Sequence, residues 1–294
     1  MRKIQIVTDS ASDVSYEAEQ KYGIRVLCFG LTVDGKAYTE RVDFKPVEFY
    51  QVMKDAARVP TTAQYTPMQF LDLYEELWQD GCTDVIYIGI NGKGSNTFSN
   101  SILARDQFYE AHPEAKEQMN IHTVDSRTYS LGYGYAVVEA ARKARKGASV
   151  SEILAYLDNW FSCCSVYFTP YTLEYARKSG RISSAAAFVG ELMGLKPIIT
   201  FQDGESKNLE KVRGEKAVVP ALVKLGLKTM IPHTEYVVIA GSNPEHARQL
   251  AAEMEKALGY PPAMMENAGA AIAINAGPDL VGLVVKNKNP GGRP

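Results

Sequence analysis

The stretch IYIGINGKGSNTFSNS, residues 86–101, indicates how the first half of the chain is built. Its apolar beginning predicts a buried strand over residues 85–90. Glycine, asparagine, lysine, serine and threonine follow, and the pattern then predicts a helix from about residue 97 to residue 111. A strand, a polar loop and a helix in this order form one unit of an α/β fold.

The same order recurs on both sides of this stretch. Strands are predicted over residues 3–8 and 121–124, and each precedes a helix. The clearest helix is TPMQFLDLYEELWQDG, residues 66–81, in which Thr66 is the predicted N-cap and Gln69 completes a capping box. Repeated units of this length predict a mainly parallel sheet in an N-terminal α/β domain.

Two Asp-Gly pairs predict tight turns. The pair at residues 34–35 follows a strand-like run over residues 24–33 and is typical of a hairpin. The pair at residues 203–204 follows the strand-like segment KPIITFQ.

The second half of the chain has a different pattern, with strands that favour some antiparallel pairing. The further predicted strands cover residues 165–168, 236–240, 270–275 and 281–285. We therefore expect two domains, with residues 1–165 as an N-terminal α/β domain and residues 166–294 as a second α/β domain with a mixed sheet.

The composition argues against a nucleic-acid-binding or membrane-spanning protein. The net charge of -2 offers no basic surface to nucleic acid. No apolar run approaches the roughly 20 residues that cross a bilayer, and the aspartate at position 9 comes too early for the apolar core of a signal peptide. The four cysteines lack CxxC spacing and are expected to be reduced. We expect a cytoplasmic protein without stable membrane insertion.

The polar loop after residue 90 is a candidate anion site. It fails the phosphate-loop pattern and also the GxGxxG pattern, because a threonine occupies position 97. Ser95, Asn96 and Thr97 nevertheless lie where a helix begins, and free backbone N–H groups at such a position suit a carboxylate. The alternative is that Ser95 simply caps its own helix.

Other hydroxyl groups repeat this chemistry. Asp-Ser pairs at residues 9–10 and 125–126 each come directly after a predicted strand, and Thr61 and Thr62 precede a predicted helix. The carboxyl ends of parallel strands meet at one edge of a sheet, where ligands bind. Each feature alone is explained equally by turn and cap chemistry. Together they predict a hydroxyl-lined, mostly uncharged cleft.

Eight segments follow one another in a recognisable order: IVTDSASDV, TxQxxP at 62–67, SxTF at 95–98, DSRTYSLGYG, LEYARKSGRIS, LKPIITFQDGE, KVRGEKA and NAGPDLVGL. In this order they resemble the DegV-like family of bacterial fatty-acid-binding proteins across essentially the whole chain.

The resemblance implies a two-domain α/β protein that holds one fatty acid, with the carboxylate between the domains and the tail in an apolar tunnel. The head-group loops then belong to residues 1–165 and the acyl-chain tunnel to residues 166–294. In members that work in fatty-acid activation, a separate kinase phosphorylates the bound carboxylate with ATP, and the binding protein has no nucleotide site.

The resemblance also implies a head-group site. The threonine of the family's TSQP motif falls on Thr62, and the serine of its SGTY motif falls on Ser95. Both hydroxyls can donate to a carboxylate oxygen. The histidine of its HTGPG motif, which completes the head-group site, falls on Asn275. The arginine of its KVR motif falls on Arg213, which the family places near the pocket mouth, where phosphotransfer occurs.

Three positions depart from these motifs, with Tyr65 for a proline, Asn96 for a glycine and Asn275 for the histidine. Asn275 can donate an N–H group but is neutral and does not titrate. A charge-assisted bond worth ~1.5–3 kcal/mol is thereby replaced by one worth about 1 kcal/mol. A long acyl chain offers on the order of 10 kcal/mol, at ~0.8 kcal/mol per buried methylene, so a lipid is still expected.

The candidate tunnel segment is SSAAAFVGELMGLKPII, residues 183–199. It offers Ala186, Phe188, Val189, Leu192, Met193 and Leu195. An ordinary core helix explains these residues equally well.

We predict a fatty-acid carrier with no catalytic residue, cofactor or metal. One alternative is a binder of another small carboxylate or of a neutral lipid, as the asparagine at position 275 would indicate. A second is a hydrolase in which Asp9, Asp125 and Ser95 act as base and nucleophile. The sequence has no GxSxG elbow for that reaction, and no HExxH motif or Cys/His cluster indicates a metal site.

Overall fold

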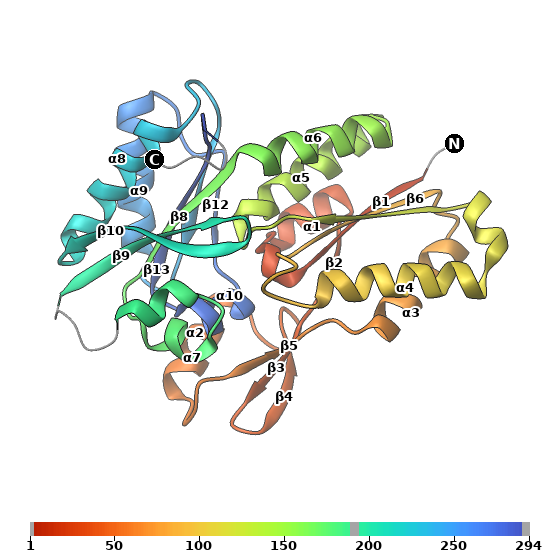
Figure 1. Cartoon of the computed structure of the whole chain (residues 1–294), viewed down its shortest axis with the longest axis horizontal. Coiled ribbons are helices and arrows are strands. Elements are labelled where there is room, and N and C mark those ends of the chain that lie inside the picture. Colours follow the sequence, from red (N-terminus) through yellow and green to blue (C-terminus); the bar gives the residue numbers. More distant parts are fainter. Residues whose placement is uncertain (1–2, 189–193, 290–294) are drawn as a thin grey trace.

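The computed structural model describes residues 3–188 and 194–289, with the side chains of 186–188 left out. Three sheets organise these residues (Figure 1). A four-stranded sheet with helices α3 and α4 lies on the right of the view, and a six-stranded sheet with α8 and α9 lies on the left. A three-stranded sheet lies below them.

The four-stranded sheet is entirely parallel, as predicted, with the order β2-β1-β6-β7. Ile6 of β1 packs with Val137 of α5 on one face, whereas Val7 packs with Phe70 and Phe108 on the other. Both faces are therefore buried, as parallel sheets require. The elements are β1 (Ile4–Asp9), η1 (Ser10–Ser12), α1 (Tyr16–Tyr22), β2 (Arg25–Leu27), α3 (Pro67–Gln79), β6 (Asp84–Gly89), α4 (Thr97–Ala111), η2 (Pro113–Glu117), β7 (Asn120–Asp125), α5 (Leu131–Arg145) and α6 (Val150–Cys163).

The three-stranded sheet contains the predicted hairpin. It is antiparallel, with the order β4-β3-β5, and its elements are β3 (Gly30–Val33), β4 (Lys36–Thr39), α2 (Pro46–Asp55) and β5 (Thr61–Ala63). Asp34 and Gly35 both have positive φ, 47° and 82°, which is the conformation that an Asp-Gly hairpin turn requires. The single strand-like run predicted over residues 24–33 is wrong, because β2 and β3 belong to different sheets.

The six-stranded sheet is mixed, as predicted, with the order β10-β9-β8-β13-β11-β12. Only the pair β11 and β12 is parallel among its described neighbours. Helices α8 and α9 pack against one face through residues such as Leu222 and Leu250. The elements are β8 (Cys164–Pro170), α7 (Glu174–Ser179), η3 (Ser183–Phe188), β9 (Leu195–Gln202), β10 (Glu205–Arg213), η4 (Glu215–Ala217), α8 (Val218–Thr229), β11 (Tyr236–Ala240), α9 (Pro244–Leu258), β12 (Met264–Asn267), α10 (Ala270–Ala276) and β13 (Leu280–Lys286).

The predicted strand over residues 270–275 is wrong, because this segment is the helix α10. Its run of seven residues, AAIAINA, is too short for its apolar pattern to separate a strand from a helix. Alanine favours the helix, and the N–H groups at its beginning are accepted by buried carboxylates described below. The change of sheet falls at β8, which begins at Cys164, and the division into domains at residue 165 stays a prediction.

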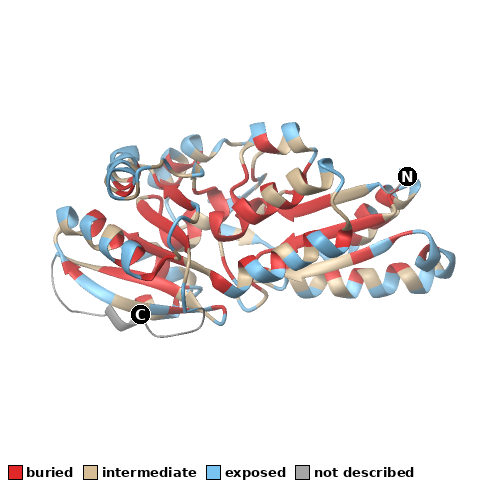
Figure 2. Ribbon diagram, turned by 90° about the horizontal axis from the view of Figure 1, so that it is seen from above, coloured by how far each residue is buried: buried red, intermediate tan, exposed pale blue. Residues whose placement is uncertain are grey.

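Buried residues run through the strands along the length of the molecule (Figure 2). None of the helices in the described ranges is long and apolar enough to cross a membrane.

Candidate ligand cavity

A cavity of about 1030 Å³ lies between the parallel sheet and the six-stranded sheet. On one side it is lined by Phe29, Ile90 and Ser130, which follow the carboxyl ends of β2, β6 and β7. Parallel sheets bind ligands at this edge. The volume lies at the upper end of the range of small-molecule pockets, ~300–1,000 Å³, so it suits an extended ligand.

The far wall is the inner face of the six-stranded sheet, and it is mostly apolar. Phe168 and Phe201 stack there, with ring centroids 5.4 Å apart and an interplanar angle of 11°. Val166, Ile239 and Leu280 come from β8, β11 and β13 beside them. These five residues offer dispersion contacts, which suit a hydrocarbon chain. Glu205 and Ser206 of β10 add polar groups where this strand reaches the cavity.

Three predicted head-group residues line the cavity and add polar groups to its wall. Thr62 comes from β5, Ser95 from the loop after β6 and Asn275 from α10, and all three line the cavity. Asn96 lines it too. Residues far apart in the sequence thus surround one space, although their role in binding stays a prediction.

Ser95 has a structural bond as well as a place on the wall. Its Oγ accepts the backbone N–H of Thr97 at 3.3 Å and lies 2.9 Å from Oγ1 of Thr97. The formal N-cap of α4 is Asn96, whose side chain makes no capping bond. Ser95 therefore supports the beginning of the helix while it faces the cavity, so the two interpretations of this residue are compatible.

Asn275 is held by its own helix. Its Nδ2 donates to the backbone carbonyl oxygen of Ala271 at 2.7 Å. The backbone carbonyl oxygen of Asn275 accepts from the hydroxyl of Ser179 at 3.1 Å. An amide nitrogen carries two N–H groups, so one is left over for a ligand oxygen after this bond.

Two predicted residues do not line the cavity. Thr97 is fully buried, and its Oγ1 accepts the N–H of Tyr65 at 3.4 Å. Arg213 ends β10, whereas Glu205 at the other end of this strand lines the cavity. At ~3.4 Å per residue the two ends lie roughly 25 Å apart. Direct contact of Arg213 with a ligand in this cavity is therefore not supported.

Several of the predicted tunnel residues lie outside the described part of the chain. Val189, Leu192 and Met193 fall there, as do the side chains of Ala186 and Phe188. Leu195 begins β9 and is not part of the lining. The apolar wall that the structure does describe comes from the sheet rather than from this segment.

The Asp-Ser pairs after the strands do not line the cavity either. Asp9 is fully buried and accepts from the hydroxyls of Tyr87 at 2.9 Å and Tyr133 at 2.6 Å, and from the N–H of Ile90 at 2.9 Å. Burial raises the pKa of this carboxyl group. Asp125 accepts the N–H of Gly92 at 3.0 Å and so shapes the loop.

This arrangement does not favour a hydrolase. Neither Asp9 nor Asp125 is hydrogen-bonded to Ser95 among the described contacts, so no base is placed to activate that hydroxyl. No group of three or more His, Cys, Asp or Glu side chains within residues 3–188 and 194–289 is placed to hold a metal ion.

Charged residues at the cavity were missed by the sequence analysis. Arg181 lines it, and its Nη1 donates to the carbonyl oxygen of Ser179 at 2.8 Å. Its position depends on Gly180, whose φ of 69° ends α7. The segment LEYARKSGRIS contains this arginine, but its place at the cavity follows only from the turn at Gly180.

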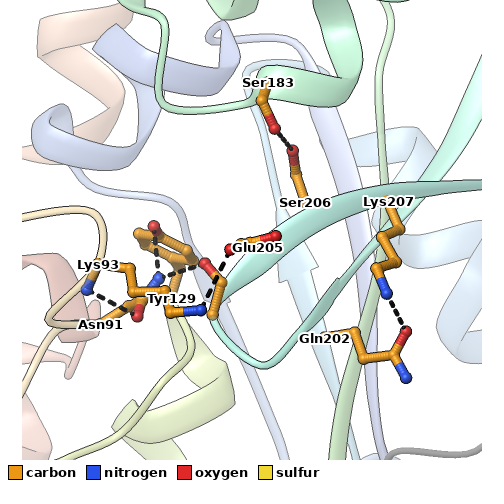
Figure 3. A network of polar contacts seen from close by, with 9 residues as sticks. Asn91, Lys93, Tyr129, Ser183, Gln202, Glu205, Ser206 and Lys207 are labelled. Carbon is orange, nitrogen blue, oxygen red and sulfur yellow. Dashed lines mark hydrogen bonds and ion pairs between the residues drawn. The ribbon is translucent and has the colours of Figure 1, made fainter.

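A bridge of polar contacts crosses the edge of the cavity (Figure 3). Nδ2 of Asn91 donates to the hydroxyl of Tyr129 at 2.8 Å and to the carbonyl oxygen of Gly204 at 2.7 Å. Nζ of Lys93 forms an ion pair with Glu205 at 3.1 Å. These contacts join the loop after β6 to the turn between β9 and β10.

Comparisons with known proteins identify a family model and a relative that match almost the whole chain. The model of the DegV family, described as "Uncharacterised protein, DegV family", matches residues 3–288. A DegV domain-containing protein of Caldanaerobacter subterraneus subsp. tengcongensis is 32% identical over 98% of this chain and 100% of its own length.

Solved structures are similar as well. A DegV family protein from Thermus thermophilus, described with fatty acid binding, is 28% identical, with a TM-score of 0.83 over 98% of this chain and 100% of its own. DegV from Bacillus subtilis, described as a fatty acid binding protein, is 25% identical, with a TM-score of 0.82 over the same shares.

Proposed function

The chain belongs to the DegV family, and from this premise we propose that it binds one long-chain fatty acid in the cavity between the sheets. The carboxylate lies at Thr62, Ser95 and Asn275, and the hydrocarbon chain runs along the inner face of the six-stranded sheet. The observation that carries the proposal is a single cavity with hydroxyl and amide groups on one part of its wall and stacked apolar rings on another.

The energetics favour a lipid even though the carboxylate site is mostly neutral. Burial of an acyl chain offers on the order of 10 kcal/mol, at ~0.8 kcal/mol per methylene. The neutral amide of Asn275 gives up only ~0.5–2 kcal/mol relative to a charged histidine. Arg181 supplies a positive charge on the same wall.

The protein acts as a carrier in this proposal and has no catalysis of its own. The carrier role is supported by the buried carboxyl groups Asp9, Asp13 and Glu40, which accept hydrogen bonds from the protein itself and are not part of the described lining. Presentation of the bound acid to a separate fatty acid kinase, which the family resemblance implies, is a further part of the proposal, as is a cytoplasmic location.

A binder of a neutral lipid is the second candidate. It is favoured by Asn275, whose amide offers both a donor and an acceptor and so suits an alcohol or an ester as well as a carboxylate.

The experiment is mass spectrometry of the lipid extracted from freshly purified, denatured protein. A fatty acid in near-stoichiometric amount is expected from the unmodified chain and a reduced amount from the double variant Thr62→Ala with Ser95→Ala. A matched control is Thr61→Ala with Ser99→Ala, which alters exposed hydroxyls outside the described lining. An alcohol or ester would support the second candidate, and an empty protein that also fails to take up added fatty acid would overturn the carrier proposal.

A further inference from the structure

The short helix α10 is held at its beginning by two buried carboxyl groups from the first part of the chain. The N–H of Gly269 donates to Oδ1 of Asp13 at 2.7 Å, and the N–H of Ala271 donates to Oε1 of Glu40 at 2.8 Å. Asp13 is only 5% exposed and Glu40 only 2%. The partners are 256 and 231 residues apart in the sequence, so these bonds join the two halves of the molecule.

The second oxygen of each carboxyl group accepts a hydroxyl. Ser130 donates to Oδ2 of Asp13, and Ser10 donates to Oε2 of Glu40. The Oγ of Ser10 in turn accepts the N–H of Phe29 at 3.0 Å. Each of the four carboxyl oxygens therefore has a donor, as buried carboxylates require.

Several residues of this hydrogen-bond network line the cavity. Phe29, Ser130 and Ala271 line the cavity, and so does Asn275, one turn further along α10. The two carboxyl groups themselves are not part of the described lining. Asp13 is hydrogen-bonded to the lining residue Ser130 and Glu40 to the lining residue Ala271, so each is one hydrogen bond away from the lining.

Gly269 shows how close this contact is. A Cβ atom at this position would lie 2.8 Å from Oδ1 of Asp13 and 2.8 Å from Oε1 of Glu40. Only glycine leaves room for both oxygens at the beginning of the helix.

Three other helices of this chain are capped by a hydroxyl group. Ser15, Thr66 and Ser149 supply a hydroxyl to α1, α3 and α6. The seven-residue α10 instead uses Asp13 and Glu40, although burial opposes their ionised forms and raises the pKa of both. The beginning of α10 is therefore held by groups from distant segments, whereas α1, α3 and α6 are capped by the residue that directly precedes each helix.

We propose that Asp13 and Glu40 are positioning residues of the ligand site. By holding α10 against the first half of the chain, they set the distance of Asn275 from Thr62 and Ser95, and with it the affinity for a carboxylate head group. This inference rests on the proposed fatty-acid binding.

The test compares two ligands with the same chain length, palmitic acid and hexadecanol, on the delipidated full-length protein. The ratio of their affinities measures the head-group contribution, because the buried hydrocarbon is the same. For Asp13→Ala and Glu40→Ala we expect the preference for the acid to fall about five- to tenfold, the effect of losing one hydrogen bond between Asn275 and the carboxylate.

Conservative variants should rescue the preference. In Asp13→Asn the amide oxygen can still accept from Gly269 while the amide N–H donates to the rotated hydroxyl of Ser130. Glu40→Gln can keep its bonds in the same way. Both are expected to retain the acid preference within about twofold to threefold, because the contact with α10 survives.

A stability control separates positioning from simple destabilisation. Asp84 is also a buried carboxyl group, 3% exposed, but it lies at the start of β6 and accepts from Thr83 and Asn120. Asp84→Ala should lower the free energy of unfolding and leave the acid preference unchanged.

The outcomes distinguish the two proposals. Alanine variants that remain folded and keep the acid preference of the unmodified protein would overturn the positioning role alone. An unmodified protein that binds neither ligand would overturn the proposed function, and this inference with it. A loss of preference in the alanine variants and also in the Asp84 control would assign the effect to general destabilisation and overturn the positioning role.

Discussion

The side-chain amide of Asn91 donates to the carbonyl oxygen of Gly204 at 2.7 Å, across 113 residues of sequence. Asn91 is 1% exposed, and the two residues belong to the loop after β6 and to the turn between β9 and β10. Both of these segments contribute to the cavity wall. The hydrogen bond therefore closes one edge of the cavity from the two halves of the molecule.

Asn91→Ala should speed the release of bound fatty acid. The change removes the bonds to Gly204 and Tyr129 and leaves a buried carbonyl oxygen without its donor, at a cost of ~1–3 kcal/mol. Stopped-flow displacement of a fluorescent fatty acid measures the rate. Lys93→Ala is the control, because its ion pair with Glu205 is exposed and contributes under ~1 kcal/mol. Equal release rates in both variants would contradict a closing role for Asn91.

Gly204→Ala should destabilise the protein more than an alanine at an ordinary left-handed glycine. Gly204 has a φ of 78°, and a Cβ there would lie 2.6 Å from Oδ1 of Asn91. Gly147 has a φ of 84° with nothing within 4 Å of the same atom, so Gly147→Ala measures the backbone strain alone, ~1–2 kcal/mol. Urea unfolding gives both free energies. Equal losses of unfolding free energy in the two variants would show that the side chain of Asn91 moves aside without destabilising the protein.

Asn275→His should strengthen the binding of a fatty acid at low pH. An imidazolium group makes a charge-assisted bond, and the gain over a neutral amide corresponds to roughly tenfold in affinity. The gain should appear below the ordinary histidine pKa of about 6.5 and fade above it. Titration calorimetry with palmitic acid between about pH 5.5 and 8 measures it. Hexadecanol, which carries no charge, should show no such pH dependence.

Three buried carboxyl groups should make the fold more stable in mild acid than near neutrality. Burial raises the pKa of Asp9, Asp13 and Glu40 above their ordinary values of 3.8 and 4.5. The folded protein then holds protons that the unfolded chain has released at the same pH. The contribution to stability is complete below the unfolded pKa values and is lost as the pH rises through the raised folded values.

Urea unfolding at several pH values above about 4 measures this slope. Asp13→Asn removes one of the three groups and should flatten it. An unchanged slope in this variant would mean that Asp13 titrates alike in the folded and unfolded chain.

Much of the fold was predictable because its signals are local. The strands β1, β6 and β7, the capping box of α3 and the Asp-Gly hairpin each follow from residues within one element or one turn. The candidate head-group residues Thr62 and Ser95 were predicted from family motifs, and both line the cavity.

Other features depend on partners far away in the sequence. The segment AAIAINA is compatible with a strand or a helix, and its N–H groups are accepted by Asp13 and Glu40, which lie more than two hundred residues earlier. Which end of β10 faces the cavity depends on how the sheets pack, and Arg213 lies at the end that is not part of the described lining.

By itself the sequence determined the strand–loop–helix units and the parallel sheet, because periodicity, caps and turns act over a few residues. The order of its motifs indicated the family. Only the tertiary structure decided that α10 is a helix, that Asn275 lines the same cavity as Thr62 and Ser95, and that Arg181 adds a charge to its lining. The physical reason is that these features rest on burial and on hydrogen bonds between distant segments. Such contacts exist only when the two halves of the molecule are packed together.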